Sequence, residues 1–172
     1  MNSVERREKI EKILNTSNDP LSAGTLAKEF NVSRQVIVGD IAIMRASGLK
    51  ISATPRGYVI DKLHDDNLIF TIACKHTNEN MAKELYTIVD NGGAILDVTV
   101  EHGVYGQIVG ELHIFSRYDI DLFLEKIKKN KSLPLSNLTG GIHLHRIQCK
   151  DEETYKRITH VLDKENILFE EK

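Results

Sequence analysis

The chain contains no tryptophan, only two cysteines (Cys74 and Cys149), and no apolar run that approaches the roughly 18 residues of a membrane span. Two cysteines cannot build a disulfide framework, so we expect a protein of the reducing cytoplasm. The first residues contain no apolar signal-peptide core, which fits this expectation. With only five phenylalanines and five tyrosines, the core must consist mainly of isoleucine, leucine and valine.

The composition is that of a globular protein, with 41% hydrophobic and 28% charged residues, and it excludes a disordered or collagen-like chain. Its 172 residues fit one large domain or two small ones. The net charge of −2 hides an asymmetry: residues 1–60 hold nine basic and six acidic side chains, and the remainder holds 14 basic and 19 acidic ones. This distribution favours contact of the first part alone with a polyanion.

Residues 1–61 are predicted to form three short helices followed by a hairpin. The expected helices are 3–14, 23–30 and 34–46, and the expected strands are 50–53 and 57–60. Ser22 and Ser33 are of the residue type that caps a helix N-terminus. This order of elements is typical of a winged helix-turn-helix DNA-binding domain.

The third predicted helix has the chemistry of a recognition helix. Its apolar residues Val36, Ile37, Ile41 and Met44 are expected to pack inward. Arginine and glutamine at its start can make bidentate contacts to purines in a major groove. Arg56 falls on the wing tip, where a phosphate or minor-groove contact fits. The predicted DNA-binding residues are Ser33, Arg34, Gln35, Val38 and Arg56. The alternative is a small helical domain with a solvated basic face.

Residues 67–172 are predicted to form a second domain, after a polar linker at 61–67. The expected strands are 69–74, 94–101, 107–115 and 142–149, the expected helices are 79–90, 117–130 and 152–164, and 167–169 is an expected edge strand. In the strand 94–101 the side chains are expected to alternate regularly between the two faces of the sheet. Helices on one face of a mostly antiparallel sheet make an α+β domain.

Two histidines in the strand 142–149 suggest a metal site. Residues two apart in a strand point to the same side, so His143 and His145 project together. His76 follows the first strand and Glu84 lies in the next helix, so they supply a third and a fourth ligand. The alternative is a polar, solvent-facing strand. Cys74 and Cys149 are expected to be buried small apolar residues rather than ligands.

Several motifs together resemble the three-histidine (3H) regulatory domain. They are His76-Thr-x-Glu79, Glu84-Leu-x-x-Ile-Val-Asp-x-Gly-Gly, Val-Glu-His102-x-Val-Tyr-Gly, Ser116-Arg117-x-Asp and Gly141-Ile-His143-Leu-His145. With the helix-turn-helix ahead of them, nearly the whole chain is similar to the niacin-responsive transcriptional repressors of bacteria. The family's usual proline is replaced by Gly103 in the third motif.

The resemblance implies a dimeric repressor of NAD biosynthesis and niacin uptake genes, which binds operator DNA and is not an enzyme. Nicotinic acid is the implied co-repressor, and a fold similar to the histidine-containing phosphocarrier protein is implied for the second domain. The family's metal ligands fall on the residues that the spacing also suggests, namely His76, Glu84, His143 and His145. One divalent transition metal per chain (Zn, Ni, Fe or Mn) suits them.

The effector is expected to use an open position on the metal. The candidate ligand-binding residues are His102, which lines the site, Tyr105, which stacks on the ring, and Arg117, which pairs with the carboxylate. Two other hypotheses stay open on the residues alone. The metal itself is the effector, or the second domain is a metal-dependent hydrolase fused to a DNA-binding domain.

Overall fold

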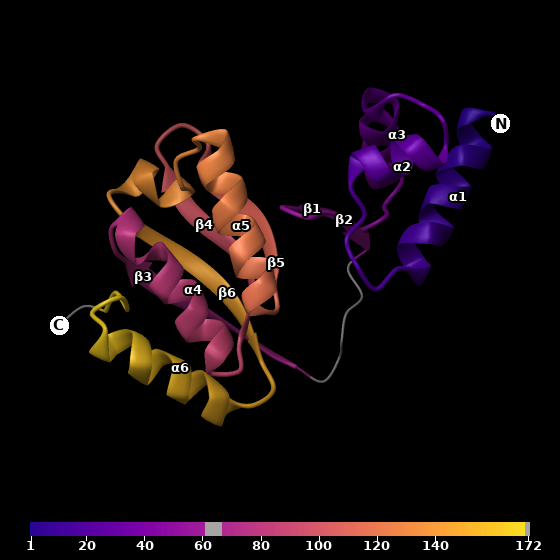
Figure 1. The fold of residues 1–172 in the computed structure, drawn as a ribbon. Helices are drawn as coiled ribbons and strands as arrows, with labels where there is room; N and C mark the ends of the chain where they lie inside the picture. Colours follow the sequence, from indigo (N-terminus) through magenta and orange to yellow (C-terminus); the bar gives the residue numbers. More distant parts are fainter. Residues whose placement is uncertain (61–66, 171–172) are drawn as a thin grey trace. The chain divides into compact units, whose positions relative to one another are not determined.

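The structure, a computed structural model, describes residues 1–60 and 67–170. The chain divides into two compact units, Met1–Leu63 and His64–Lys172 (Figure 1). The predicted linker at 61–67 lies, apart from Asn67, outside the described residues. In the two described ranges no helix is both long and apolar enough to cross a membrane.

The first unit consists of three helices and a two-stranded hairpin, as predicted. Its elements are α1 (Ser3–Thr16), α2 (Ala23–Glu29), α3 (Arg34–Ala46), β1 (Ile51–Thr54) and β2 (Gly57–Ile60). Each helix begins at a side-chain cap, because Asn2, Ser22 and Ser33 each accept a hydrogen bond from a backbone N–H of the first turn. An antiparallel bridge between Leu21 and Tyr58 joins the hairpin to the segment before α2.

One apolar cluster holds the first unit together. Its fully buried members come from all three helices and β1: Ile10, Leu14, Leu26, Ala27, Ile37, Ile41, Met44 and Ile51. The expectation that Val36 packs inward is wrong, because Val36 is 38% exposed. The inward face of α3 instead includes Asp40, which is only 4% exposed.

Asp40 is held in this interior by an ion pair with α1. Its Oδ2 lies 2.6 Å from Nε of Arg6 and its Oδ1 3.2 Å from Nη2 of the same guanidinium. Nη1 of Arg7 lies 3.5 Å from Oδ1. A buried carboxylate is costly unless it is paired and hydrogen-bonded, so α3 is stable only in the orientation that brings Asp40 to these arginines.

The second unit is an antiparallel sheet with three helices. Its elements are β3 (Leu68–Lys75), η1 (Asn78–Asn80), α4 (Met81–Asp90), β4 (Ala94–His102), β5 (Gly106–Ile114), α5 (Arg117–Asn130), η2 (Leu135–Thr139), β6 (Ile142–Cys149) and α6 (Glu152–Lys164). The strand order is β3-β6-β4-β5. β6, the last strand in the sequence, therefore lies between β3 and β4, and both pair with it in antiparallel register.

The core of this unit lies between one face of the sheet and α4, α5 and α6. It contains buried side chains from all four strands and all three helices, among them Ile72, Leu85, Ile88, Ile95, Ile114, Ile120, Ile147, Ile158 and Leu162. Along β6, the residues His143, His145 and Ile147 alternate with more exposed neighbours, so all three side chains point toward this helix-covered face.

The regular alternation expected for 94–101 is wrong at one point, because β4 contains a bulge between Ile95 and Asp97. Ile95 belongs to the core. The Asp97 side chain instead accepts a hydrogen bond from Arg146, its partner in the β4–β6 register, on the face of the sheet away from the helices. A bulge inserts one extra residue and re-aims the residues that follow it. Sequence alternation alone gives no sign of it.

The residues after α6 pair with the edge of β3. Leu168 forms an isolated bridge with Cys74, the N–H of Lys75 donates to the carbonyl of Ile167 at 2.9 Å, and the N–H of Phe169 donates to the carbonyl of Ala73 at 2.8 Å. The expected edge strand at 167–169 is thus a single bridge. It covers the outer edge of β3 at the position of Cys74.

We expect Asp40→Asn to destabilise the first unit. The change removes the negative charge that pairs with the largely buried guanidinium of Arg6. The midpoint of thermal unfolding, followed by circular dichroism, should therefore fall. Asp19→Asn is the matched control, because Asp19 is 77% exposed and its pair with Arg56 is a surface ion pair of small energetic value. An Asp40→Asn midpoint no lower than that of Asp19→Asn would contradict this account of the ion pair.

Candidate metal centre

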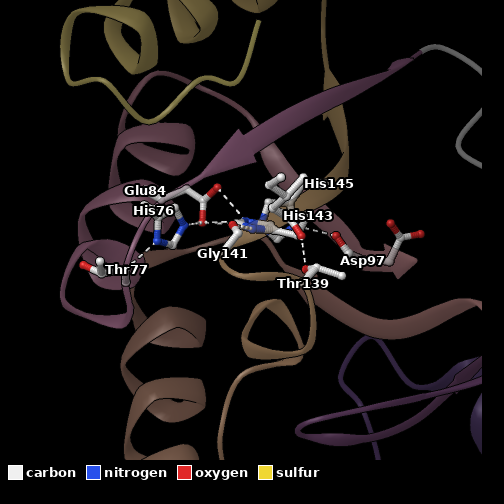
Figure 2. A network of polar contacts seen from close by, with 9 residues as sticks. His76, Thr77, Glu84, Asp97, Thr139, Gly141, His143 and His145 are labelled. Atoms are coloured by element: carbon white, nitrogen blue, oxygen red, sulfur yellow. Dashed lines mark hydrogen bonds and ion pairs between the residues drawn. The ribbon is translucent and has the colours of Figure 1, made fainter. Parts of the chain in front are cut away.

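Three histidines and a glutamate converge at one end of the sheet of the second unit. Lys75, the last residue of β3, pairs with Ile142, the first residue of β6, so the end of one strand lies beside the start of the other. His76 directly follows β3, and His143 and His145 project from β6. Glu84 lies in the first turn of α4, where a negative charge is favoured by the helix dipole. Figure 2 shows the four side chains pointing toward one another.

The Glu84 carboxylate is the centre of this arrangement. Its Oε2 lies 2.7 Å from Nε2 of His76 and 3.5 Å from Nε2 of His145, and its Oε1 lies 3.1 Å from Nε2 of His143. The four side chains are between 1% and 4% exposed. The structure therefore brings the four predicted ligands together, and the alternative of a solvent-facing histidine strand is wrong.

Each imidazole is oriented by a backbone carbonyl on its other nitrogen. Nδ1 of His76 lies 2.7 Å from the carbonyl oxygen of Thr77. Nδ1 of His143 lies 2.9 Å from the carbonyl oxygen of Gly141, and Nδ1 of His145 lies 2.6 Å from that of Asp97. A carbonyl only accepts, so Nδ1 must carry the hydrogen in all three rings. In the neutral form each Nε2 then directs a lone pair at Glu84. This is the orientation in which histidines ligate metals.

If all three rings are neutral, their Nε2 lone pairs face the carboxylate, so a cation is needed among them, either a proton on Nε2 or a metal ion. Burial lowers the pKa of His145 and of His76, but attraction to Glu84 outweighs burial and holds the pKa of both rings above the ordinary value. Burial likewise raises the pKa of the Glu84 carboxyl, yet the charge on His145 and the hydrogen bonds from the three rings hold it well below its usual range. The site is thus an anionic, buried carboxylate that needs a positive partner.

The donor spacing fits a metal ion as that partner. Donors at about 2.0–2.2 Å from one ion in tetrahedral or octahedral geometry lie roughly 2.8–3.6 Å from one another. The nitrogen–oxygen separations here run from 2.7 to 3.5 Å. The residues therefore fit a divalent metal with nitrogen and oxygen ligands.

A glycine allows the His76 loop to approach β6. Gly141 has φ +95°, and a Cβ built on it would lie 2.5 Å from the carbonyl oxygen of His76. The N–H of His76 donates to the carbonyl of Gly141, which also accepts from Nδ1 of His143. Gly141 therefore fixes two of the histidines at once, and any larger residue would push them apart.

Cys74 adjoins the same centre. Its sulfur, a carboxylate oxygen of Glu84 and a ring nitrogen of His143 all lie within 4.8 Å of one another, and this buried group can bind a metal. Cys74 is 0% exposed, and burial, with a further effect of the Glu84 charge, raises the pKa of its thiol well above the ordinary range. It was expected to be a core residue only. The signal that sequence reasoning missed is its spacing of two residues from His76.

His102 and Tyr105 lie at the tip of the β4–β5 hairpin. This tip is at the same end of the sheet as His143, because Thr99 of β4 pairs with Leu144 of β6 and the hairpin continues beyond it. The N–H groups of Val104 and Tyr105 donate to Nδ1 of His102, and the His102 and Tyr105 ring centroids are 5.1 Å apart. Tyr105 is 77% exposed.

Arg117 lies apart from the other candidates. It begins α5, at the end of β5 that is opposite to the hairpin tip. Its guanidinium makes two hydrogen bonds to Asp90, at the C-terminal end of α4, and covers the ring of Tyr86 at 4.7 Å. Glu84 is at the other end of α4. The structure thus brings Arg117 together with Asp90 and not with the histidine centre.

The predicted DNA-contacting residues lie on the first unit. Arg34, Gln35 and Val38 are exposed on α3. Oγ of Ser33 accepts from the N–H of Val36, so this side chain serves as the helix cap. Arg56, between β1 and β2, bonds Asp19.

Known proteins share both parts of this chain. An HTH domain family matches residues 6–59 and the 3H domain family matches residues 69–171. The chain is 45% identical to the probable transcription repressor NiaR of Thermotoga maritima over 167 residues, which are 97% of this chain and 95% of that protein. It is 37% identical to the transcription repressor NadR of Bacillus subtilis over 169 residues, which are 96% of this chain and 94% of that protein.

A helix-turn-helix unit joined to a 3H unit defines a DNA-binding transcription repressor and not an enzyme. The hydrolase hypothesis is thereby set aside. More specifically, the chain belongs to the NiaR/NadR family of transcription repressors.

We expect Gly141→Ala to abolish high-affinity metal binding and to destabilise the second unit. The left-handed backbone alone costs a residue with a Cβ on the order of 1–3 kcal/mol, and the new Cβ overlaps the His76 carbonyl. Gly140→Ala is the matched control, since its φ is +60° but no atom lies within 4 Å of the added Cβ. Urea unfolding and bound metal per chain measure both effects. Full metal binding by Gly141→Ala would contradict the role given to this glycine.

Proposed function

We propose that this protein represses genes of NAD biosynthesis and niacin uptake, with nicotinic acid as co-repressor and a metal-containing 3H domain as its sensor. The observation that carries the proposal is the convergence of three Nε2 atoms on the buried Glu84 carboxylate. That arrangement is built for a cation, and a metal with an open position binds a small carboxylate or a pyridine nitrogen.

His76, Glu84, His143 and His145 would hold one divalent transition metal per chain. Three imidazoles and a carboxylate suit Zn, Ni, Fe or Mn. The metal would supply an electrophilic position for the anionic effector. The chain's own residues would hold that position by the carbonyl bonds on Nδ1, which prevent the rings from turning away.

The hairpin tip would supply the remaining effector contacts. The Tyr105 ring is exposed at the same end of the sheet and would cover the planar nicotinate ring, beside His102. Arg117 stays a prediction as the partner of the effector carboxylate. That role requires its present pair with Asp90 to open.

The first unit would bind operator DNA as a winged helix. The N-terminal end of α3 would enter the major groove with Arg34, Gln35 and Val38, and Ser33 and Arg56 would lie near the backbone. A homodimer would place two α3 helices in successive grooves about 34–36 Å apart, and the effector would act by changing that spacing. We assign residues 1–61 to DNA binding and residues 67–172 to sensing. The second domain would have a phosphocarrier-like fold, and the protein would act in the cytoplasm.

Calorimetric titration of nicotinic acid into metal-loaded and chelator-stripped protein tests the proposal. We expect heat of binding only from the metal-loaded form, because the carboxylate needs the metal as its partner. Nicotinamide, which lacks the carboxylate charge, is the ligand control. Metal-dependent operator binding without any heat from nicotinic acid would instead favour the metal itself as effector.

His143→Ala should abolish metal and nicotinate binding together, since it removes one ligand and leaves Glu84 buried with a partner missing. His160→Ala is the matched control, because His160 is exposed on α6. Metal content measured by elemental analysis and binding measured by calorimetry check the pair. Stoichiometric metal in His143→Ala would refute the ligand assignment.

Arg34→Ala and Gln35→Ala should each weaken operator binding by about 1–3 kcal/mol and relax specificity, because each removes a contact to a base edge. Lys12→Ala removes the same charge as Arg34→Ala, from an exposed position on α1, and serves as the control. Fluorescence anisotropy with operator and scrambled duplexes gives the measurement. Equal losses on both duplexes would show that these side chains contact phosphates rather than bases.

A further inference from the structure

We propose that Cys74 is a direct ligand of the metal in this centre, and that its sulfur makes the site selective for a thiophilic divalent metal, such as Zn²⁺, Ni²⁺ or Co²⁺, over Mn²⁺. This inference rests on the metal-binding part of the proposed function and adds a donor that neither the spacing of the histidines nor the 3H motifs include.

The register of the sheet aims this thiol into the centre. Cys74 of β3 is directly opposite His143 of β6, so the two side chains leave the same face of the sheet side by side. Both point to the face on which α4 places Glu84. The sulfur, the Glu84 carboxylate and the His143 ring each offer a ligand atom within 4.8 Å of the others.

Cys74 is closed to solvent. Cys74 is 0% exposed, and the bridge to Leu168 covers the edge of β3 beside it. A buried cysteine that only fills space behaves as a small apolar residue. Here the space beside the sulfur holds a carboxylate and an imidazole rather than apolar atoms alone, which is the surrounding of a ligand.

The chemistry of sulfur then decides which metal is preferred. Thiolate is a soft ligand that favours zinc and its neighbours, whereas manganese prefers oxygen. When the sulfur–metal bond forms, the thiol loses its proton to solvent, so the site gains one negative charge and releases one proton. Without the sulfur, the remaining histidine and glutamate donors bind all of these metals with less discrimination.

Cobalt(II) is the probe for this bond. Chelator-stripped full-length protein is titrated with Co²⁺, and the visible d–d bands report binding, while a near-ultraviolet charge-transfer band reports a sulfur ligand. We expect both in the unaltered protein and in Cys149→Ser. Cys149 is the matched control, since it is also buried but pairs with Leu68 at the far end of β3. Cys74→Ser should keep the d–d bands and lose the charge-transfer band.

Competition between Zn²⁺ and Mn²⁺ gives the second measurement. The ratio of the Mn²⁺ dissociation constant to the Zn²⁺ dissociation constant should fall by about tenfold or more in Cys74→Ser and stay unchanged in Cys149→Ser. If Cys74→Ser does not fold, Cys74→Ala replaces it. The unaltered protein and Cys149→Ser decide the question by themselves in any case, because the chain has only these two cysteines.

The outcomes separate the two levels of the proposal. Cobalt d–d bands without a charge-transfer band in the unaltered protein overturn the sulfur ligand and leave the histidine–glutamate site intact. A charge-transfer band that persists in Cys74→Ser, or an unchanged metal preference, also overturns it. Failure of the unaltered protein to bind cobalt or zinc overturns the metal centre of the proposed function and this inference together.

Discussion

The buried carboxylate of Glu84 is the group on which the second unit depends. A charge with 1% exposure is tolerated only where enough partners surround it. Those partners come from the residue that follows β3, from β6 and, through the carbonyls that orient the rings, from β4 and the Gly141 loop. The same carboxylate therefore helps to fix the mutual positions of one helix, two strands and the loops that carry His76 and Gly141.

The first unit contains a smaller version of this constraint. Asp40 is buried on α3, and Arg6 and Arg7 of α1 compensate its charge. Apolar packing of Ile37, Ile41 and Met44 holds α3 in the domain, but it tolerates small rotations. An ion pair with two fixed hydrogen bonds does not. The orientation of the helix that carries Arg34 and Gln35 is thus set by a directional contact and not by the apolar core alone.

Local patterns in the sequence predicted most of the elements and the four histidine and glutamate residues that converge in the centre. The period of two in β6 placed His143 and His145 on one side, and the caps at Ser22 and Ser33 marked two helix starts. Contacts between distant residues had no such signature. The bulge at Asp97, the pairing of Arg117 with Asp90 and the position of Cys74 opposite His143 depend on the register of strands and on helix packing. Periodicity says which side a residue faces, and it cannot say which residue of another element it meets.

The place of β6 between β3 and β4 also sets when the centre can exist during synthesis of the chain. Glu84 and His143 are 59 residues apart in sequence. At roughly 5–20 residues per second, the ribosome takes about 3–12 s to make that stretch. All residues of the DNA-binding unit have been made before it begins. Every newly made chain therefore passes through an interval in which the helices of the first unit have all been made and the histidine–glutamate centre has not.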